Sequence, residues 1–219
     1  MSWNREQPQR GRRPFVRPVD DPPGTSRLFI AVPVADDVRD GIGAIMEKLA
    51  GGPVDERRPG QPRWVRVDGL HLTLRFLGAT LDERRAELAA AIETVAAQTT
   101  PFQVVLSGGG AFPNQYRPRV LWIGIGEGVA ELNAMERRLD AELRRLGWPG
   151  DDRPFNAHLT LARTDGVPGA DEVASRLVDE ARGVSLGWRA SRLVLYKSNL
   201  GHGPTHYEAL AASELAASE

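Results

Sequence analysis

Cysteine is absent from the sequence, histidine occurs only four times, and Lys48 and Lys197 are the only lysines among its basic residues. The absence of cysteine excludes disulfides, thiolate nucleophiles and cysteine-based zinc sites, and it fits a reducing compartment such as the cytoplasm. The formal net charge is −1, so no global positive field points to nucleic acid or to a membrane surface. No apolar run approaches the ~20 residues that span a bilayer. We therefore expect a cytoplasmic protein with no membrane partner.

The first 26 residues differ in composition from the rest of the chain. They are rich in proline and arginine, contain few side chains that could pack, and lack the apolar segment of a secretory signal. We therefore expect a disordered basic tail over residues 1–26. A solvated extension explains its arginines, and a basic arm that contacts RNA phosphates is the alternative.

The rest of the chain, residues 27–210, follows one order of elements twice. In each half an apolar strand is followed by a helix, a His-Leu-Thr-Leu strand, a second helix and a third strand. The pattern predicts one α+β domain with two lobes, built as a pseudo-twofold duplication of a β-α-β-α-β unit. We expect mostly antiparallel sheets to line a central cleft, with the helices outside. The two halves are expected at about 27–107 and 119–210, and a C-terminal tail at 211–219.

The boundaries of the elements follow from apolar periodicity and from turn-forming residues. Thr80, with Glu83 three residues later, resembles a capping box that would open the second helix. The glycine-rich segment 108–119 is predicted to be a turn before a strand. The expected strands are 27–34, 63–67, 71–77, 102–106, 119–125, 158–163, 191–198 and 205–210, and the expected helices lie near 36–50, 80–95, 129–147 and 170–182.

One short sequence occurs twice. Residues 71–78 read HLTLRFLG and residues 158–163 read HLTLAR, so two of the four histidines open the same four letters. Alternate side chains of a strand face opposite ways. His71, Thr73 and Arg75 are therefore expected on one face, while the leucines between them face the helices.

The second copy sorts in the same way and suggests what the pair does. If a twofold axis relates the halves, His158 and Thr160 meet His71 and Thr73 across the cleft. An imidazole has a pKa near ~6.5, so one ring can take a proton while the other gives one, and threonine hydroxyls can donate to phosphate oxygens. The sequence has no GKS or GKT phosphate loop and no HExxH helix. The arrangement fits acid–base hydrolysis of a phosphodiester with water as the nucleophile.

Two simpler interpretations of the histidines stay open. Each histidine could be a hydrogen-bonded core residue of an amphipathic strand, which is the simpler explanation of a single copy. The pair could also bind zinc, but no third ligand is apparent in register with them. The occurrence of both copies at equivalent places in a repeated layout favours catalysis over either alternative.

The sequence is similar to the RNA 2′,3′-cyclic phosphodiesterases, also called 2′–5′ RNA ligases, of the two-histidine phosphoesterase superfamily. The resemblance covers about residues 27–210 and includes RLFIAV, LHLTLRFLG, GAFPNQYRPRVLWIG, FNAHLTLAR, LYKSNL and YEAL. It implies a bilobal fold, no metal and no cofactor, and hydrolysis of a terminal RNA 2′,3′-cyclic phosphate to a 2′-phosphate. We expect RNA with such an end as the partner, and a monomeric protein.

The resemblance also implies the role of each motif residue. His71 would donate a proton to the leaving 3′ oxygen, and His158 would be the general base that activates water. Thr73 and Thr160 would hold the phosphate oxygens. The sequence alone treats the two histidines symmetrically, so this division of roles comes from the resemblance.

Two arginines compete for the phosphate. The second motif in this family often extends to an arginine, which Arg163 matches here, but strict alternation turns Arg163 away from the cleft. Alternation favours Arg75, which has weaker support from the resemblance. Either guanidinium could stabilise the charge that builds on phosphate during in-line attack.

Other residues have simple structural explanations. Phe29 could stack a base, although core packing explains it as well. Tyr116, Arg117 and Arg119 could line the mouth of the cleft and contact RNA. His202 and His206 are expected on the surface, and Trp64, Trp122 and Trp188 in the core.

Three other functions stay open at this point. The chain could be a related phosphoesterase for a small cyclic phosphate or a 2′–5′ oligonucleotide, or it could join RNA ends 2′–5′ as the reverse reaction. No nucleotide-activating lysine site is apparent for ligation. It could also be a non-catalytic protein that binds RNA ends. Pure binding would favour arginine or lysine over the intact pair of histidines.

Overall fold

The computed structural model describes residues 22–54, 60–151, 154–199 and 205–217. Residues 1–21 of the expected tail, and His202, lie outside the described residues. The elements are β1 (Thr25–Pro33), α1 (Asp36–Ala50), β2 (Arg63–Trp64), the 3-10 turn η1 (Val67–Gly69), β3 (His71–Leu81), the 3-10 turn η2 (Asp82–Arg84), α2 (Arg85–Ala97), β4 (Phe102–Phe112), β5 (Val120–Glu127), α3 (Val129–Arg145), β6 (His158–Arg163), α4 (Ala170–Ala181), β7 (Leu186–Ala190), β8 (Arg192–Asn199) and β9 (His206–Glu214).

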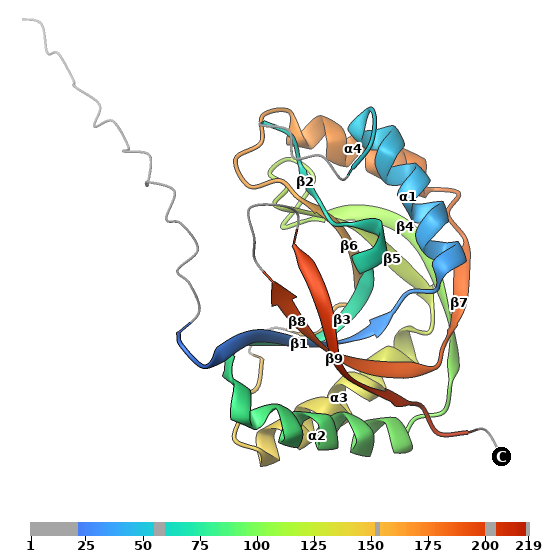
Figure 1. Ribbon diagram of the computed structural model, residues 1–219. Helices are drawn as coiled ribbons and strands as arrows, with labels where there is room; N and C mark the ends of the chain where they lie inside the picture. The colour runs from blue at the N-terminus through green and yellow to red at the C-terminus, as the bar shows by residue number, and fades with distance from the viewer. Residues whose placement is uncertain (1–21, 55–59, 152–153, 200–204, 218–219) are drawn as a thin grey trace, which may run out of the picture.

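The described strands form two antiparallel sheets with the same internal order (Figure 1). Sheet A runs β3-β1-β8-β9, and sheet B runs β2-β6-β5-β4-β7. The strands β3, β1, β8 and β9 of sheet A therefore correspond to β6, β5, β4 and β7 of sheet B, which β2 extends at one edge. The expected α+β class and the duplication with antiparallel sheets are confirmed.

The two sheets do not coincide with the two halves of the sequence. β4 belongs to the first half but pairs with β5 and β7 in sheet B, whereas β8 belongs to the second half but pairs with β1 in sheet A. The indole N–H of Trp188 in β7 also donates to the carbonyl of Pro33 at the end of β1, at 3.1 Å. Each half thus contributes its third strand to the other sheet, which ties both sheets into one unit.

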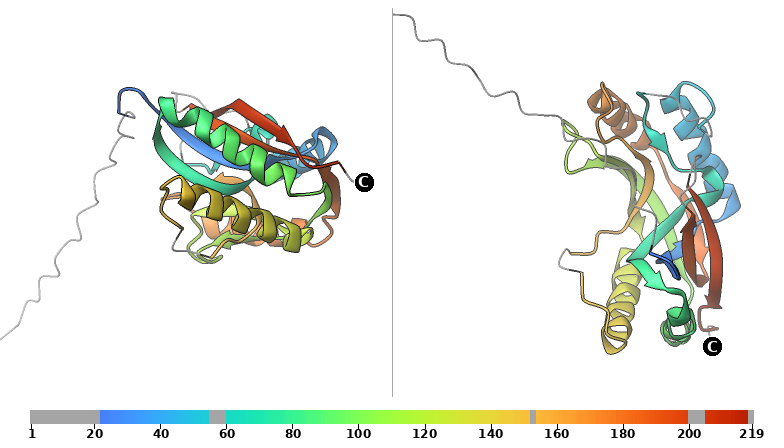
Figure 2. Two further views of the ribbon diagram at one scale, coloured as in Figure 1. Left: turned by 90° about the horizontal axis from the view of Figure 1, so that it is seen from below. Right: turned by 60° about the vertical axis from the view of Figure 1, so that its left-hand side comes forward.

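The helices pack in two pairs at opposite ends of the molecule (Figures 1 and 2). α1 contacts α4, and α2 contacts α3. No helix in the described ranges is long and apolar enough to cross a membrane. The apolar stripes expected from the sequence are buried, and they include Val38, Ile42, Met46 and Leu49 of α1 and Leu132, Met135, Leu139 and Leu143 of α3.

Glycine explains why β4 is longer than expected. The segment predicted to be a turn continues the strand to Phe112. A Cβ atom on Gly110 would lie 2.5 Å from the ring of Trp122, and one on Gly109 would lie 2.8 Å from Ala181. The missing side chains let a tryptophan of β5 and the helix α4 pack directly on this strand.

Three further boundaries differ from the sequence expectation. Thr80 lies inside β3, where its hydroxyl donates to the carbonyl of Gly78 at 3.3 Å, so the predicted capping box is wrong. The short, glycine-containing strand β7 was not expected from its pattern. β9 continues to Glu214, so residues 211–214 form part of sheet A rather than a tail.

Candidate active site

The two His-Leu-Thr-Leu sequences open β3 and β6, and these strands contact one another across the two sheets (Figure 1). Over the first four residues of both strands the leucines are buried, whereas the histidine and the threonine are half-buried. The buried leucines hold each strand in the core. The two His-Thr pairs therefore lie on the faces turned away from that packing, as the alternation predicts.

Both histidines are held by the same contact. Nδ1 of His71 lies 2.7 Å from the carbonyl oxygen of Gly69, and Nδ1 of His158 lies 2.7 Å from that of Asn156. A carbonyl oxygen only accepts hydrogen bonds, so Nδ1 carries the proton and donates it in both rings. Neither Nε2 atom has a hydrogen-bond partner among the described residues. Each neutral ring can therefore accept a ligand's proton at one defined atom.

Aromatic rings enclose His71. Its ring centroid lies 4.7 Å from that of Phe29, 5.0 Å from that of Tyr207 in an edge-on contact, and 6.0 Å from that of Tyr196. Burial among these rings lowers the pKa of His71 from 6.5 to about 4, against the opposing effect of the Gly69 carbonyl. His71 is therefore neutral near pH 7 in the free protein.

His158 has a smaller aromatic environment and a cationic neighbour. Its ring meets that of Phe112 edge-on at 5.0 Å and lies 6.5 Å from that of Trp122. Burial lowers the pKa of His158, the carbonyl of Asn156 raises it, and the charge of Arg163 lowers it again. Trp122, expected in the core, is half-buried and forms part of this environment.

Thr73 and Thr160 complete the two pairs. Both are half-buried, two residues along the strand from their histidines. Neither hydroxyl has a hydrogen-bond partner among the residues that the structure describes. Both hydroxyls can therefore donate to a ligand bound against the histidines.

A β-bulge follows the threonine in both copies. The pairing register shifts at Leu74 in β3 and at Leu161 in β6. In each copy the bulged leucine and the next residue are both buried, and the residue after them is exposed. An extra residue reverses the alternation beyond it. The bulge therefore returns Arg163 to the face that carries His158 and Thr160.

Arg163 lies between the two histidine environments. Its charge lowers the pKa of His158, and it also acts on Tyr207, whose ring contacts His71. The side chain is exposed and makes no ion pair within the described ranges. Because of the bulge, Arg163 lies on the face of His158 and Thr160, although strict alternation predicted the opposite face.

Arg75 has a structural position. Its side chain is only 6% exposed, and Nη1 donates to Asp140 of α3 at 2.8 Å while Nη2 donates to the carbonyl of Pro149. The prediction that Arg75 shares a face with His71 and Thr73 is wrong, because the bulge turns it toward the helices.

The aromatic cluster around His71 was largely missed from the sequence. Phe29 is 3% exposed and stacks on Tyr196 at 5.2 Å, so it packs as a core residue beneath the site. Phe76 is 64% exposed and occupies in β3 the place that Arg163 occupies in β6. Tyr196 and Tyr207 come from β8 and β9, and only the strand order brings them to His71. No local pattern indicates this cluster.

The other residues singled out in the sequence lie away from the histidine contacts. The side chain of Asn114 accepts the backbone N–H groups of Tyr116, which is 87% exposed, and of Arg117. Arg119 forms an ion pair with Asp165 at 2.7 Å. Their expected place at the mouth of a cleft stays a prediction. His206 is exposed, Trp188 is buried and Trp64 is half-buried.

The described residues assemble no group of three or more His, Asp or Glu side chains that could hold a metal ion. Within those residues the zinc alternative has no third ligand. The described residues bring two imidazoles, two hydroxyls and one guanidinium to this site.

A duplicated α+β fold with one His-Leu-Thr-Leu strand in each sheet is the architecture of a two-histidine phosphoesterase. The chain belongs to the 2′-5′ RNA ligase superfamily, whose sequence model matches residues 40–202.

Curated relatives carry one name. The Geobacillus stearothermophilus RNA 2′,3′-cyclic phosphodiesterase is 33% identical over 191 residues, which cover 87% of this chain and 57% of that protein. This chain thus spans less than two thirds of that relative. The Archaeoglobus fulgidus protein of the same name is 37% identical over 63% of this chain and 72% of its own length, and that of Methanothermobacter thermautotrophicus is 29% identical over 80% and 90%.

Solved structures share the fold. Escherichia coli LigT in complex with NADP+ is 25% identical, with a TM-score of 0.66 over 87% of this chain and 98% of LigT. A protein of Thermus thermophilus is 28% identical, with a TM-score of 0.68 over 88% of this chain and all of that one.

Proposed function

We propose that this protein is an RNA 2′,3′-cyclic phosphodiesterase, which hydrolyses the cyclic phosphate at an RNA end to a 2′-phosphate. The observation that carries the proposal is the matched pair of imidazoles. Each donates Nδ1–H to a backbone carbonyl, and each has an Nε2 atom without a partner among the described residues. The names of the curated relatives support the same activity.

The reaction moves one proton at each histidine. Nε2 of His158 takes a proton from water as the water oxygen attacks phosphorus. The bond from phosphorus to the 3′ oxygen breaks on the opposite side, and His71 donates a proton from Nε2 to that oxygen. The products are a 2′-phosphomonoester and a 3′-hydroxyl. His158 is then protonated and His71 neutral, and proton exchange with solvent restores both.

The lowered pKa values fit these roles in different ways. A neutral His158 is the form that accepts a proton, so the free protein already holds the base in its working state. His71 must gain a proton before it can donate one. A bound phosphate places negative charge beside His71 and raises its pKa. Substrate binding is therefore coupled to proton uptake.

The remaining polar groups hold the phosphate. Thr73 and Thr160 donate their hydroxyls to its oxygens, and Arg163 stabilises the charge that develops during attack. Arg163 suits this role because it is exposed and makes no ion pair within the described ranges. The proposal further includes that the protein acts as a monomer in the cytoplasm on RNA with a cyclic phosphate end.

The test uses an oligonucleotide that ends in a 2′,3′-cyclic phosphate, incubated with the purified protein in the presence of EDTA. We expect a 2′-phosphate product. His71→Ala and His158→Ala should each lower turnover by roughly 10²–10⁴-fold, the contribution of positioned acid–base catalysis. Arg145→Gln, which changes an exposed arginine of α3, is the control and should retain full turnover.

Each contrary result has a definite meaning. Full turnover in either active-site variant would overturn the two-histidine mechanism. A 3′-phosphate product would reverse the assignment of the leaving oxygen. Binding of the oligonucleotide without turnover would leave the non-catalytic RNA-end-binding alternative.

A further inference from the structure

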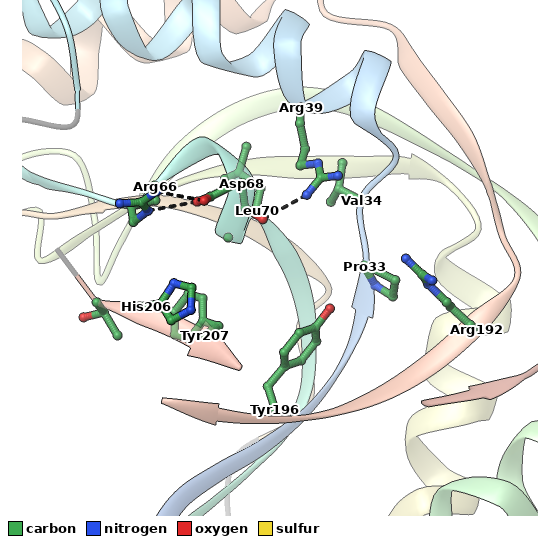
Figure 3. Close-up of a pocket in the computed structure, with 12 residues that line it drawn as sticks. Pro33, Val34, Arg39, Arg66, Asp68, Leu70, Arg192, Tyr196, His206 and Tyr207 are labelled. Carbon is green, nitrogen blue, oxygen red and sulfur yellow. Dashed lines mark hydrogen bonds and ion pairs between the residues drawn. The ribbon is translucent and has the colours of Figure 1, made fainter. Parts of the chain in front are cut away.

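A cavity of about 160 Å³ lies beside the candidate active site (Figure 3). Its walls come from the end of β1, from α1, from η1 and from the starts of β8 and β9. A space of this size holds several water molecules and can admit a phosphate group. No step of the proposed reaction uses it.

The cavity and His71 share their walls. Gly69, Tyr196 and Tyr207 line the cavity. Gly69 accepts the Nδ1–H bond of His71, and both tyrosine rings contact the imidazole. A Cβ atom on Gly69 would lie 2.9 Å from the Tyr207 ring, so glycine permits this close packing. Only the side chain of Tyr196 or Tyr207 therefore lies between the ring of His71 and the cavity.

Two arginine side chains that line the cavity act electrostatically on the hydroxyl of Tyr196. Arg39 of α1 and Arg192 of β8 both line the cavity, and the charges of both act on the Tyr196 phenol. Burial raises the pKa of Tyr196, so its hydroxyl keeps its proton and can donate. Figure 3 shows the Tyr196 side chain rising toward the space that Arg39 enters from α1 and that Arg192 borders beyond Pro33.

The surrounding carboxylates leave this end of the cavity positive. Among the described residues of the lining, Asp68 is the only acidic one, and Arg66 binds it at 2.9 and 3.0 Å. Arg39 is held by an ion pair with Asp36 and by donation to the carbonyl of Asp68 at 2.9 Å. Arg192 makes no ion pair within the described ranges. The cavity thus presents the guanidinium groups of Arg39 and Arg192 and one hydroxyl donor, a set that fits an anion. Glu214 lies opposite Arg192 in the pairing of β8 with β9, but the two side chains form no ion pair within the described ranges.

The orientation of the RNA in the proposed reaction indicates which anion would bind in the cavity. In-line attack places the water and the leaving 3′ oxygen on opposite sides of phosphorus, so the ribose lies on the side of His71. The rest of an RNA chain is attached to that same ribose through its 5′ oxygen. The chain of a bound RNA therefore continues from the side of His71, whose contacts Gly69, Tyr196 and Tyr207 also line the cavity.

We propose that the cavity binds the phosphodiester that lies 5′ to the terminal nucleotide, with Arg39, Arg192 and the hydroxyl of Tyr196 as its ligands. The inference rests on the proposed function, because the acid role of His71 sets the direction of the chain. It makes RNA ends, rather than isolated cyclic mononucleotides, the preferred substrates of this site.

The kinetic test compares two small substrates that differ only in the proposed ligand. Adenosine 2′,3′-cyclic phosphate is prepared with a 5′-hydroxyl or with a 5′-phosphate. We expect the 5′-phosphate to raise kcat/KM about tenfold, as one good charge-assisted contact would. Arg192→Gln should bring the ratio of the two kcat/KM values close to one and leave turnover of the 5′-hydroxyl substrate unchanged. Arg39→Gln should lower the same ratio.

Arg145→Gln is the matched control, because Arg145 is an exposed arginine of α3 whose partner, Glu142, lies on the same helix. This variant should keep the wild-type ratio. A wild-type ratio near one, or an equal loss with both substrates in Arg192→Gln, would overturn the proposal.

A binding measurement separates failure of this inference from failure of the proposed function. Calorimetry compares adenosine 2′-phosphate with adenosine 2′,5′-bisphosphate, neither of which requires turnover. A tenfold preference for the bisphosphate that Arg192→Gln abolishes would support the subsite, even if the protein cleaved no cyclic phosphate. Cleavage of the cyclic phosphate without a preference for the bisphosphate would support the phosphodiesterase activity and overturn the proposed subsite.

Discussion

The two His-Leu-Thr-Leu strands match in sequence and backbone but differ in their surroundings. In both, Nδ1 of the histidine bonds to a carbonyl two residues earlier, and a bulge follows the threonine. The first histidine is enclosed by Phe29, Tyr196 and Tyr207. At the place after the bulge, the first strand carries Phe76 and the second carries Arg163.

In the proposed reaction, this difference would give the two histidines of a symmetric duplication different roles. Two identical rings can exchange protons with a ligand but cannot decide which is acid and which is base. The aromatic enclosure keeps His71 neutral in the free protein, and the charge of Arg163 lowers the pKa of His158. The duplicated strands would then supply the acid and the base, and the side chains around them would separate the two roles.

Among variants that keep both histidines, the largest effect should come from replacing the two arginines, which lie in different environments. Arg163→Gln should lower kcat by about 100-fold, the scale of one lost stabiliser of a developing anion. Arg75→Met should instead lower the free energy of unfolding by roughly 2 kcal/mol. This loss is smaller than that of a fully buried pair, because Asp140 keeps Arg144 at 2.6 Å.

Steady-state kinetics and urea denaturation on both variants separate the two effects. Assays run well below the unfolding midpoint should show near wild-type kcat for Arg75→Met. A large loss of kcat in Arg75→Met, with stability unchanged, would mean that Arg75 contacts the ligand and that the bulge does not turn it toward the helices.

The two arginines show which parts of the site can be predicted from the sequence and which cannot. The order of strands and helices apart from β7, the α+β class and the leucine-inward alternation were predictable, because apolar periodicity reports burial directly. The bulges were not, because Leu74 and Leu161 continue an apolar pattern that fits a regular strand equally well. The extra residue reverses the facing of the side chains that follow it, which in β3 extends to a second register shift at Leu77.

The surroundings of the histidines depend on long-range pairing. Phe29, Tyr196 and Tyr207 lie on three strands, and sheet A includes β8 from the other half of the sequence. A repeat suggests that each half forms its own sheet, and nothing local indicates the exchange of the third strand. The repeated His-Leu-Thr-Leu motif therefore predicted which side chains share a face, but the environment that lowers the pKa of His71 required the tertiary structure.

The next effect tests the enclosure of His71 through stability. Its folded pKa of about 4 lies below the 6.5 of the ordinary imidazole, so the unfolded chain binds the proton more readily. The resulting stability is complete above pH 6.5 and is lost as pH falls toward 4. Between pH 7 and 5 the wild type should lose about 2 kcal/mol through this group. His71→Gln should remove that part of the pH dependence.

Urea denaturation at several pH values measures this loss, and His206→Gln serves as the control at an exposed histidine. The control should keep the wild-type slope of stability against pH. An unchanged slope in His71→Gln would mean that the ring is not enclosed as the structure has it, and the contrast between the two histidines would disappear.

The smallest effect should distinguish the two threonines. Thr73→Val and Thr160→Val each remove one hydroxyl donor at nearly constant volume, and a charge-assisted hydrogen bond contributes about tenfold. We expect about tenfold lower kcat/KM for Thr73→Val, because its strand carries Phe76 where the other strand carries a guanidinium. Thr160→Val should lose only about threefold, since Arg163 on the same face still holds the phosphate. Serine at each position restores the hydroxyl and should restore turnover. Equal losses at both threonines would show that Arg163 does not share the phosphate with Thr160, and the asymmetry would then rest on the histidine environments alone.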